Sequence, residues 1–280
     1  MSTTKKKIAR WNDGMEYKRL GKTREKISAI GIGTWKMGVE PKREAEAIRA
    51  AVERGVNLVD TAEMYGTEHI VREALDGYDN VFVATKVSPS HFRHDDLIRA
   101  CNASLERLGV REIDLYQLHW PNNSIPIKET MQAMEELVKQ GKIRHIGVSN
   151  FSLSELKEAQ AALKSNEIVS EQVEYSILVR EPEHGLLDYC KKERITLIAY
   201  SPLARGAIFE KKYNALQMRL EGIGSKYKKS ASQVALNWLI RKEPVVAIPK
   251  AGNVEHAIEN AEAASFRLSE QDLKEVNGFL

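Results

Sequence analysis

Four residues in the first half of the chain carry side chains that suit proton transfer: Asp60, Tyr65, Lys86 and His119. Reduction of a carbonyl by hydride transfer builds negative charge on the substrate oxygen, so a site needs a proton donor and fixed hydrogen-bond donors there. Tyrosine has a pKa of about 10 in water, and a nearby lysine ammonium would lower it. We therefore interpret Tyr65 as the acid and Lys86 as its activator. Asp60 would hold Lys86, and His119 would supply a second hydrogen bond that orients the carbonyl.

Each of the four residues also has an ordinary structural explanation. Asp60 could cap a helix, and Tyr65 could simply line the mouth of a barrel. Lys86 could be a solvated strand end, and His119 could be a satisfied histidine before a Trp-Pro turn. The combination favours a site, because all four fall at or just beyond the carboxyl ends of predicted strands two, three and four.

Short β-rich runs alternate with segments of helical period along the chain. Several runs are almost continuously apolar, as expected for parallel strands covered by helices. Eight such units in one chain of 280 residues favour a closed (β/α)8 TIM barrel over an open doubly wound sheet. The predicted strands are 29–33, 56–60, 81–87, 113–119, 143–149, 168–174, 195–201 and 245–249.

The segments outside the eight units predict smaller elements. Two short β-capable stretches around Gly21 and Lys22 indicate an N-terminal hairpin that closes the barrel floor. The tail from Asn253 onward predicts two C-terminal helices, the second beginning at the box from Ser269 to Asp272. We expect residues 1–16 to be flexible and residues 17–280 to form a single barrel domain.

Composition excludes several classes of protein. The net charge of +3 is slight for this length, and no apolar run approaches the roughly 18 residues of a membrane span. We expect no nucleic-acid or membrane partner. Cys101 and Cys190 are far apart and outside any CxxC spacing, which argues against a disulfide framework and a zinc site. We expect a cytoplasmic protein without a metal, as a monomer or weak homodimer.

Familiar nucleotide and hydrolase motifs do not hold. Gly31 and Gly33 begin a GxGxxG pattern, but Lys36 occupies the place of its third glycine, so a Rossmann fingerprint is not supported. A phosphate loop ending at Gly21 would need a glycine where Glu16 stands. HExxH and GxSxG do not occur.

Several long segments resemble those of the aldo-keto reductases, in order and over roughly residues 17–276. They read GIGTW, LVDTAEMYG, ATKV, LERLGVREIDLYQLHWP, GKIRHIGVSNF, EQVEYS, IAYSPLARG and AIPKAGNVEHAIENA. The resemblance implies a (β/α)8 barrel that binds an extended nicotinamide cofactor without a Rossmann domain. It also implies NAD(P)(H)-dependent interconversion of aldehydes or ketones with primary or secondary alcohols, with Tyr65 as the acid and Asp60, Lys86 and His119 as its partners.

The resemblance carries over cofactor positions residue by residue. The side chains of Ser149, Asn150 and Gln172 would hold the carboxamide, and Tyr200 would stack on the nicotinamide ring. These types suit the task, since amide and hydroxyl groups satisfy a carboxamide and an aromatic face suits a planar ring. Thr34 and Asp60 would lie near the ribose. The pyrophosphate would be covered by Ser201, Leu203 and Arg205.

The adenosine end departs from the family pattern. Many members carry Lys-Ser followed by an Arg five residues after that Ser, which grips the 2′-phosphate of NADPH. This chain has Lys250, Ala251 and His256 there. Arg offers permanent charge and paired donors, whereas imidazole is largely neutral near pH 7. We expect a weakened NADPH preference, so that NADPH, NADH or both are used, with Glu259 and Asn260 available for adenine.

Substrate contacts would come from Trp35, Tyr65, His119 and Trp120, the two tryptophans walling the pocket with apolar surface. The chain ends at Leu280 in a helical pattern, which leaves little room for a long C-terminal loop, so we expect an open site. Two other functions stay open from the sequence. Some barrels of this family act as nucleotide-binding regulatory subunits of larger assemblies, and a non-redox barrel enzyme for a phosphorylated substrate is a third class.

Overall fold

The computed structural model describes residues 6–7 and 14–278, and its centre is a sheet of eight parallel strands. Strands that follow one another along the chain are also neighbours in the sheet. They are β4 (Ile32–Gly33), β5 (Leu58–Asp60), β7 (Phe82–Val87), β8 (Ile113–Leu118), β9 (Ile143–Ser149), β10 (Ile168–Glu174), β11 (Thr196–Tyr200) and β12 (Val245–Ala247).

The first and last strands meet and close the sheet into a barrel. Parallel bridges join Ile30 to Ala247 and Gly33 to Lys250. The Gly31 amide donates to the carbonyl oxygen of Ala247 over 2.8 Å, and the Ala247 amide donates to that of Ala29 over 2.9 Å. The predicted (β/α)8 TIM barrel is therefore confirmed.

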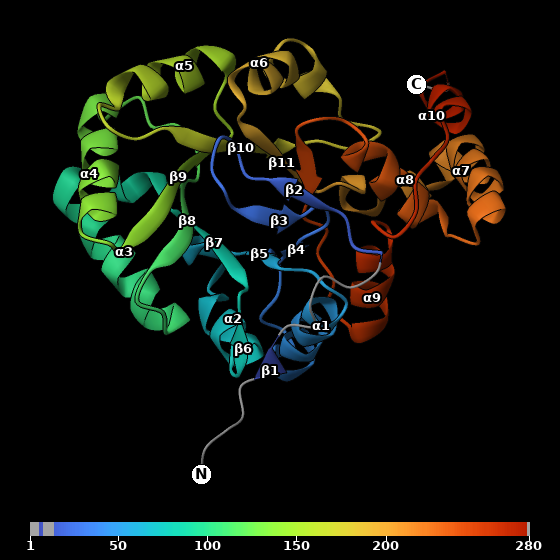
Figure 1. Cartoon of the computed structure of the whole chain (residues 1–280), viewed down its shortest axis with the longest axis horizontal. Helices are drawn as coiled ribbons and strands as arrows, with labels where there is room; N and C mark the ends of the chain where they lie inside the picture. Colours follow the sequence, from blue (N-terminus) through green and yellow to red (C-terminus); the bar gives the residue numbers. More distant parts are fainter. Residues whose placement is uncertain (1–5, 8–13, 279–280) are drawn as a thin grey trace.

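Helices surround the barrel, and each strand is followed by at least one of them (Figure 1). They are α1 (Pro41–Glu53), α2 (Glu68–Leu75), α3 (His94–Leu108), α4 (Ile127–Lys139), α5 (Leu153–Ala162), α6 (Leu186–Glu193), α7 (Asn214–Tyr227), α8 (Ala231–Ile240), α9 (Val254–Glu262) and α10 (Glu270–Asn277). The ring closes where α1 packs beside α9 (Figure 1). The two predicted C-terminal helices are confirmed, and Ser269 caps α10 by accepting from the Asp272 amide.

The predicted hairpin consists of β2 (Tyr17–Arg19) and β3 (Lys26–Ser28), paired antiparallel. Its residues Leu20 and Ile27 are fully buried and belong to the apolar cluster inside the barrel. The hairpin lies in front of the barrel strands in Figure 1, at the end from which the strands start. It closes the barrel floor, as the sequence predicts, and leaves the opposite end to the site.

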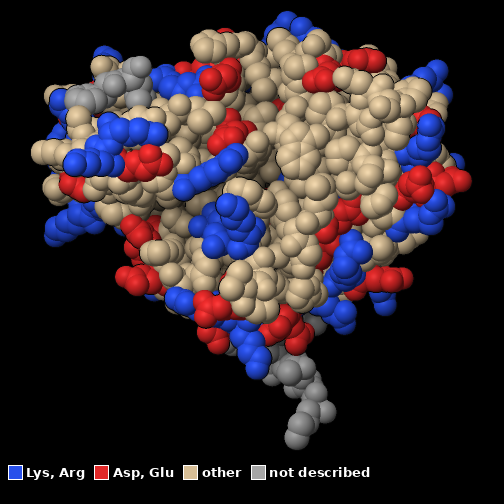
Figure 2. All heavy atoms as spheres, turned by 180° about the vertical axis from the view of Figure 1, so that it is seen from behind, with Lys and Arg blue, Asp and Glu red and all other residues tan. Residues whose placement is uncertain are grey.

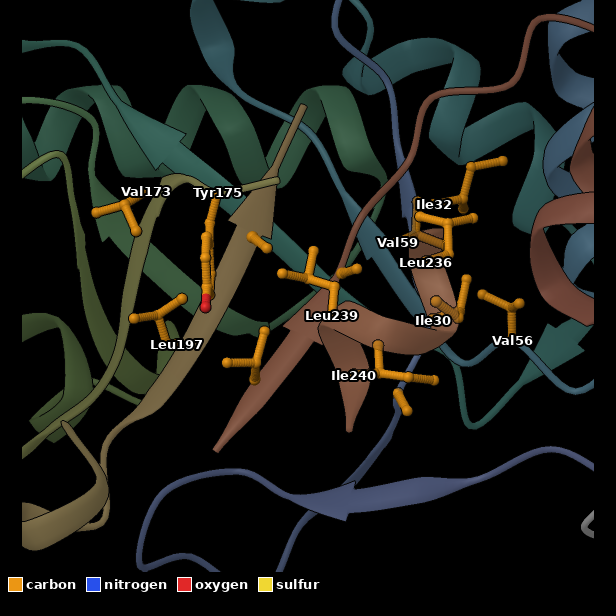
Figure 3. Packing of buried hydrophobic residues seen from close by; sticks show 14 of the residues in the cluster. Ile30, Ile32, Val56, Val59, Val173, Tyr175, Leu197, Leu236, Leu239 and Ile240 are labelled. Atoms are coloured by element: carbon orange, nitrogen blue, oxygen red, sulfur yellow. The ribbon is translucent and has the colours of Figure 1, made fainter. Parts of the chain in front are cut away.

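A larger apolar cluster fills the space between the strands and the helices. Figure 3 shows Leu236, Leu239 and Ile240 of α8 packed toward barrel residues such as Ile30 and Leu197. Helix α8 is buried over almost its whole surface, because α7 and α9 pack against it as well as the sheet. This packing holds the strand ends, and so the side chains on them, in fixed positions.

Part of the segment expected to be flexible, residues 1–16, lies outside the described residues. Within it, β1 (Lys6–Lys7) pairs in parallel with β6 (Tyr78–Asp79). Both Cys101 and Cys190 are buried free thiols. Within the described ranges, no helix has the length and apolar character needed to cross a membrane.

Candidate active site

The four proposed catalytic residues meet at the carboxyl end of the barrel, opposite the hairpin. Asp60 ends β5, Lys86 is next to last in β7, and His119 directly follows β8. Tyr65 ends a short 3-10 helix, Glu63–Tyr65, which Gly66 terminates with a left-handed φ of 68°. Parallel strands bring their carboxyl ends to one face of a barrel, so residues far apart in sequence converge there.

Lys86 and Asp60 form a buried ion pair behind the site. The Lys86 Nζ lies 2.5 Å from Asp60 Oδ1 and also donates to the carbonyl oxygen of Thr61 over 2.8 Å. The side chain of Lys86 is fully buried. Burial acts to lower its pKa, but the Asp60 carboxylate and Tyr65 outweigh burial, so the pKa of Lys86 is raised. Lys86 is therefore an ammonium ion at neutral pH.

Tyr65 lines the cavity beside His119. Its hydroxyl lies 3.2 Å from Nε2 of His119, and the Lys86 Nζ lies 5.1 Å from the centre of its ring. Burial raises the pKa of Tyr65, and the opposing effect of Lys86 is smaller. The sequence prediction of a lowered pKa is thus wrong in its net direction, although Lys86 acts in the expected sense. The phenol stays protonated at neutral pH, as an acid must before it reacts.

His119 is a neutral hydrogen-bonding group. Burial, and then the Lys86 charge, lower its pKa to about 3. Its Nδ1 is buried without a hydrogen-bond partner among the described residues, and its ring stacks on Trp120 with centroids 3.9 Å apart. A neutral imidazole with a proton on Nε2 can donate to an oxygen held beside Tyr65.

The residues assigned to the carboxamide also come together. The Ser149 hydroxyl donates to the main-chain carbonyl oxygen of Gln172 over 2.9 Å. Asn150 Nδ2 donates to the main-chain carbonyl oxygen of His119 over 3.0 Å. The Tyr200 hydroxyl donates to Asn150 Oδ1 over 2.9 Å. Asn150 has a φ of 62°, a left-handed conformation that asparagine tolerates better than most residues. These contacts join the ends of β8, β9, β10 and β11 into one polar wall.

A cavity of about 410 Å³ opens over this end of the barrel. Its wall contains every proposed catalytic residue except Lys86, which lies behind Asp60 and Tyr65. The full lining is Gly33, Thr34, Trp35, Lys36, Asp60, Tyr65, His119, Trp120, Ser149, Asn150, Gln172, Tyr200, Ser201, Pro202, Leu203, Arg205, Gly206, Phe209, Ile248, Pro249 and Lys250.

Basic and aromatic side chains share the rim of this cavity. Arg205 and Lys36 lie over the ring of Trp35, with the Arg205 guanidinium carbon 5.4 Å and the Lys36 Nζ 4.5 Å from its centre. Lys250 adds a third cation. Figure 2, which views the face opposite the hairpin, shows basic side chains gathered near its middle.

The donor set fits a nicotinamide dinucleotide. Amide and hydroxyl groups beside Tyr65 match the polar group of the nicotinamide, and the basic rim matches anionic phosphates. The loop after β11 adds exposed backbone, with left-handed φ angles at Ser201, Ala204, Arg205 and Gly206.

Three residues assigned to the adenosine end do not line this cavity. His256 is exposed in the first turn of α9, where its main-chain N–H donates to Oδ1 of the capping residue Asn253 over 2.8 Å. Glu259 accepts from the Ser230 hydroxyl over 2.5 Å, and Asn260 is only 8% exposed. Their roles toward a cofactor stay predictions.

Sequence reasoning missed Gln117, whose Nε2 lies 3.3 Å from Asp60 Oδ2. A signal was present: side chains alternate along a strand, so Leu115 and Gln117 of β8 share the face that points into the barrel. Gln117 is therefore an amide on an otherwise apolar face. Lys36 also lines the cavity, and the sequence gives no motif that predicts it there.

Comparisons with known proteins agree with this geometry. The model of the aldo/keto reductase family matches residues 29–280. Methylglyoxal reductase YeaE of Escherichia coli (strain K12) is 40% identical over 256 residues, covering 88% of this chain and 89% of its own. A crystal structure of a thermostable aldo-keto reductase with the inhibitor epalrestat superposes with a TM-score of 0.89 at 42% identity, covering 95% of this chain and 100% of its own. A Klebsiella pneumoniae aldo/keto reductase in complex with NADP and acetate gives a TM-score of 0.86 at 34% identity, with 95% of both chains covered. The chain belongs to the aldo/keto reductase family.

Proposed function

We propose that this protein is an NAD(P)H-dependent reductase of small aldehydes and ketones, which it converts to primary and secondary alcohols, and that Tyr65 is its general acid. The proposal rests above all on one observation. The Tyr65 hydroxyl and His119 Nε2 lie 3.2 Å apart at the cavity wall, with the Asp60–Lys86 pair buried behind them. A carbonyl oxygen on the cavity side, within hydrogen-bond distance of both groups, would receive a hydrogen bond from His119 and a proton from Tyr65.

The protein residues divide the work of protonation. His119, kept neutral by burial, orients the carbonyl and donates to its oxygen. Tyr65 transfers its proton as negative charge develops there, and the Lys86 ammonium stabilises the tyrosinate that results. Asp60 keeps Lys86 in position. Bound NAD(P)H supplies the hydride that reaches the carbonyl carbon.

The same cavity would hold the cofactor along its length. Ser149, Asn150 and Gln172 would bind the carboxamide, and Tyr200 would pack against the nicotinamide ring. The remaining assigned contacts are Thr34 and Asp60 near the ribose, Ser201, Leu203 and Arg205 at the pyrophosphate, and Lys250 at the adenosine end. Because Ala251 and His256 replace a hydroxyl and a guanidinium, NADH use beside NADPH is part of the proposal.

Small 2-oxoaldehydes are the substrates we propose to try first. The relative that is 40% identical is named a methylglyoxal reductase. The exposed aromatic walls of the cavity, Trp35 and Trp120, are each 40% exposed and offer a broad apolar mouth. Such a mouth suits aldehydes with a small polar head and a variable apolar body.

The variant Tyr65→Phe tests the proposal. Reduction of methylglyoxal with NADPH and with NADH would be followed by loss of cofactor absorbance. We expect kcat/KM to fall by at least about 10²-fold, the usual contribution of a general acid, while NADPH binding is retained. Tyr78→Phe is the matched control, because its hydroxyl contacts Glu53 far from the cavity. Undiminished turnover in Tyr65→Phe would refute the assignment of Tyr65.

A further inference from the structure

Gln117 belongs to a closed ring of hydrogen bonds inside the barrel. Its Nε2 lies 3.3 Å from Asp60 Oδ2, and its Oε1 accepts from Gln172 Nε2 over 3.3 Å. The Gln172 Nε2 also donates to Asp60 Oδ2 over 2.9 Å. Gln117 is fully buried and Gln172 is 1% exposed, so protein groups fix both amides.

A glycine on the neighbouring strand makes room for this ring. Gly147 of β9 is in register with Gln117 of β8. A Cβ at position 147 would lie 2.9 Å from Cγ of Gln117, closer than such atoms approach. Without a side chain at 147, Gln117 can extend past β9 to Gln172 on β10.

The ring determines which end of the Gln172 amide faces the cavity. An amide nitrogen carries two hydrogens, and those of Gln172 are directed at Asp60 and at Gln117. The carbonyl oxygen Oε1 is then the atom left for the cavity that Gln172 lines. A reversed Gln172 amide would set its oxygen against the Asp60 carboxylate and against Gln117 Oε1. Two contacts between acceptors would disfavour that orientation.

We propose that Gln117 is a positioning residue: it locks Gln172 so that an acceptor faces the bound cofactor, and the site thereby selects the N–H donor of the nicotinamide carboxamide. This inference rests on the proposed function, since it needs a bound nicotinamide. It assigns Gln117 no contact with the cofactor and no part in proton transfer.

Binding of two nucleotides without substrate tests the proposal. The probes are NADP+ and its 3-acetylpyridine analogue, whose acetyl group keeps a carbonyl acceptor but has no N–H donor. Quenching of tryptophan fluorescence would report Kd, because Trp35 and Trp120 line the cavity. We expect the wild-type protein to bind NADP+ more tightly than the analogue.

Gln117→Met keeps the length of the side chain and removes its polar atoms. Gln172 then keeps its hydrogen bond to Asp60 but loses the one to Gln117, so its amide is held less firmly in this orientation. We expect NADP+ binding to weaken by up to about fivefold to tenfold, the worth of one hydrogen bond. Binding of the analogue should change little, and the preference for NADP+ should fall by the same factor. Leu115→Met is the matched control, because Leu115 lies two residues away on the same barrel-facing side of β8.

The outcomes separate the two proposals. Failure of the wild-type protein to bind either nucleotide, and NAD+ in the same titration, would overturn the proposed function itself. Equal wild-type affinity for both nucleotides, an unchanged preference in Gln117→Met, or the same loss in Leu115→Met would overturn the role of Gln117 alone. If Gln117→Met does not fold, Gln117→Asn gives the same measurement, because its shorter amide falls out of reach of Gln172.

Discussion

Burial controls the protonation of individual residues around the site. It keeps the Tyr65 phenol protonated and the His119 imidazole neutral, so one group can give a proton and the other a hydrogen bond. Lys86 is more deeply buried than Tyr65, yet its pKa is raised because Asp60 lies within 2.5 Å. Three neighbouring groups thus owe their states to different balances of desolvation and charge.

Glu171, next to Gln172 in the chain, is a fully buried carboxyl group. One oxygen accepts from the Phe151 amide over 3.1 Å, and Oε2 has no hydrogen-bond partner among the described residues. Burial raises the pKa of Glu171 well above its usual value of 4.5. The unfolded chain therefore loses this proton near pH 4.5 while the folded protein keeps it. With fewer protons bound to the unfolded state, stability falls as pH rises above 4.5.

Glu171→Gln removes this proton linkage. We expect the variant to gain free energy of unfolding over the wild type as pH rises from 5 to 8, by up to about 1.4 kcal/mol per pH unit. Urea unfolding at each pH would measure the difference. Glu158→Gln on the exposed face of α5 is the control and should show none of this dependence. A difference for Glu171→Gln that stays constant with pH would contradict the prediction.

The sequence predicts which residues meet at the site, but it does not predict all of their protonation states. Asp60, Tyr65, Lys86 and His119 could be placed together because each lies at a predicted strand end. The net direction of the Tyr65 pKa could not be predicted, since it depends on how deeply the assembled barrel buries the phenol. Gln117 lay in the same segment as His119, but its partner Gln172 is 55 residues away, and only the closed barrel brings the two amides together.

Among the elements, the hairpin β2–β3 stabilises the barrel at the end opposite the site. Leu20 and Ile27 seal the barrel interior at one end, and the proposed catalytic groups lie at the other. We expect Ile27→Ala to lower the free energy of unfolding by about 2–5 kcal/mol, because it leaves a cavity in a closed core. Denaturant unfolding would measure the loss, and kcat/KM of the folded variant should stay near the wild-type value.

Arg24→Ala is the control for the hairpin, since Arg24 is exposed in its turn. It should leave both stability and activity almost unchanged. A large loss of kcat/KM in folded Ile27→Ala would show instead that the floor and the site are coupled.

Element boundaries were predicted best where local signals are strong. The box of Ser152 and Glu155 does cap α5, with the Ser152 oxygen accepting from the Glu155 amide. The first strand is shorter than predicted, because Ala29, Ile30 and Gly31 join β12 through isolated bonds at the barrel seam. The left-handed turn at Ala204 and Arg205 had no sequence signal, since neither residue favours positive φ.

At the scale of the whole molecule, the eight-fold alternation of strand and helix predicted the barrel, because that architecture is a consequence of periodic pattern and chain length. The sequence pattern could not predict in the same way where charged side chains gather on the folded barrel. The net charge is only +3, but Lys36, Arg205 and Lys250 lie together at the cavity. Arg205 is paired with Glu174 over 3.0 Å, so Lys36 and Lys250 contribute most of the positive charge that makes this end of the molecule attractive to anions.

The last prediction concerns this basic rim. NADPH carries roughly two more negative charges than NADH in its 2′-phosphate. Raising NaCl from about 20 mM to about 300 mM shortens the screening length from about 20 Å to about 6 Å, so attraction across the rim should weaken. We expect Kd for NADPH to rise more steeply with salt than Kd for NADH, and KM for a neutral aldehyde to stay nearly constant. Lys250→Met should bring the two salt dependences closer, whereas Lys22→Met, on the hairpin at the far end, should not. Equal slopes for both cofactors in the wild-type protein would show that the rim does not act on the 2′-phosphate.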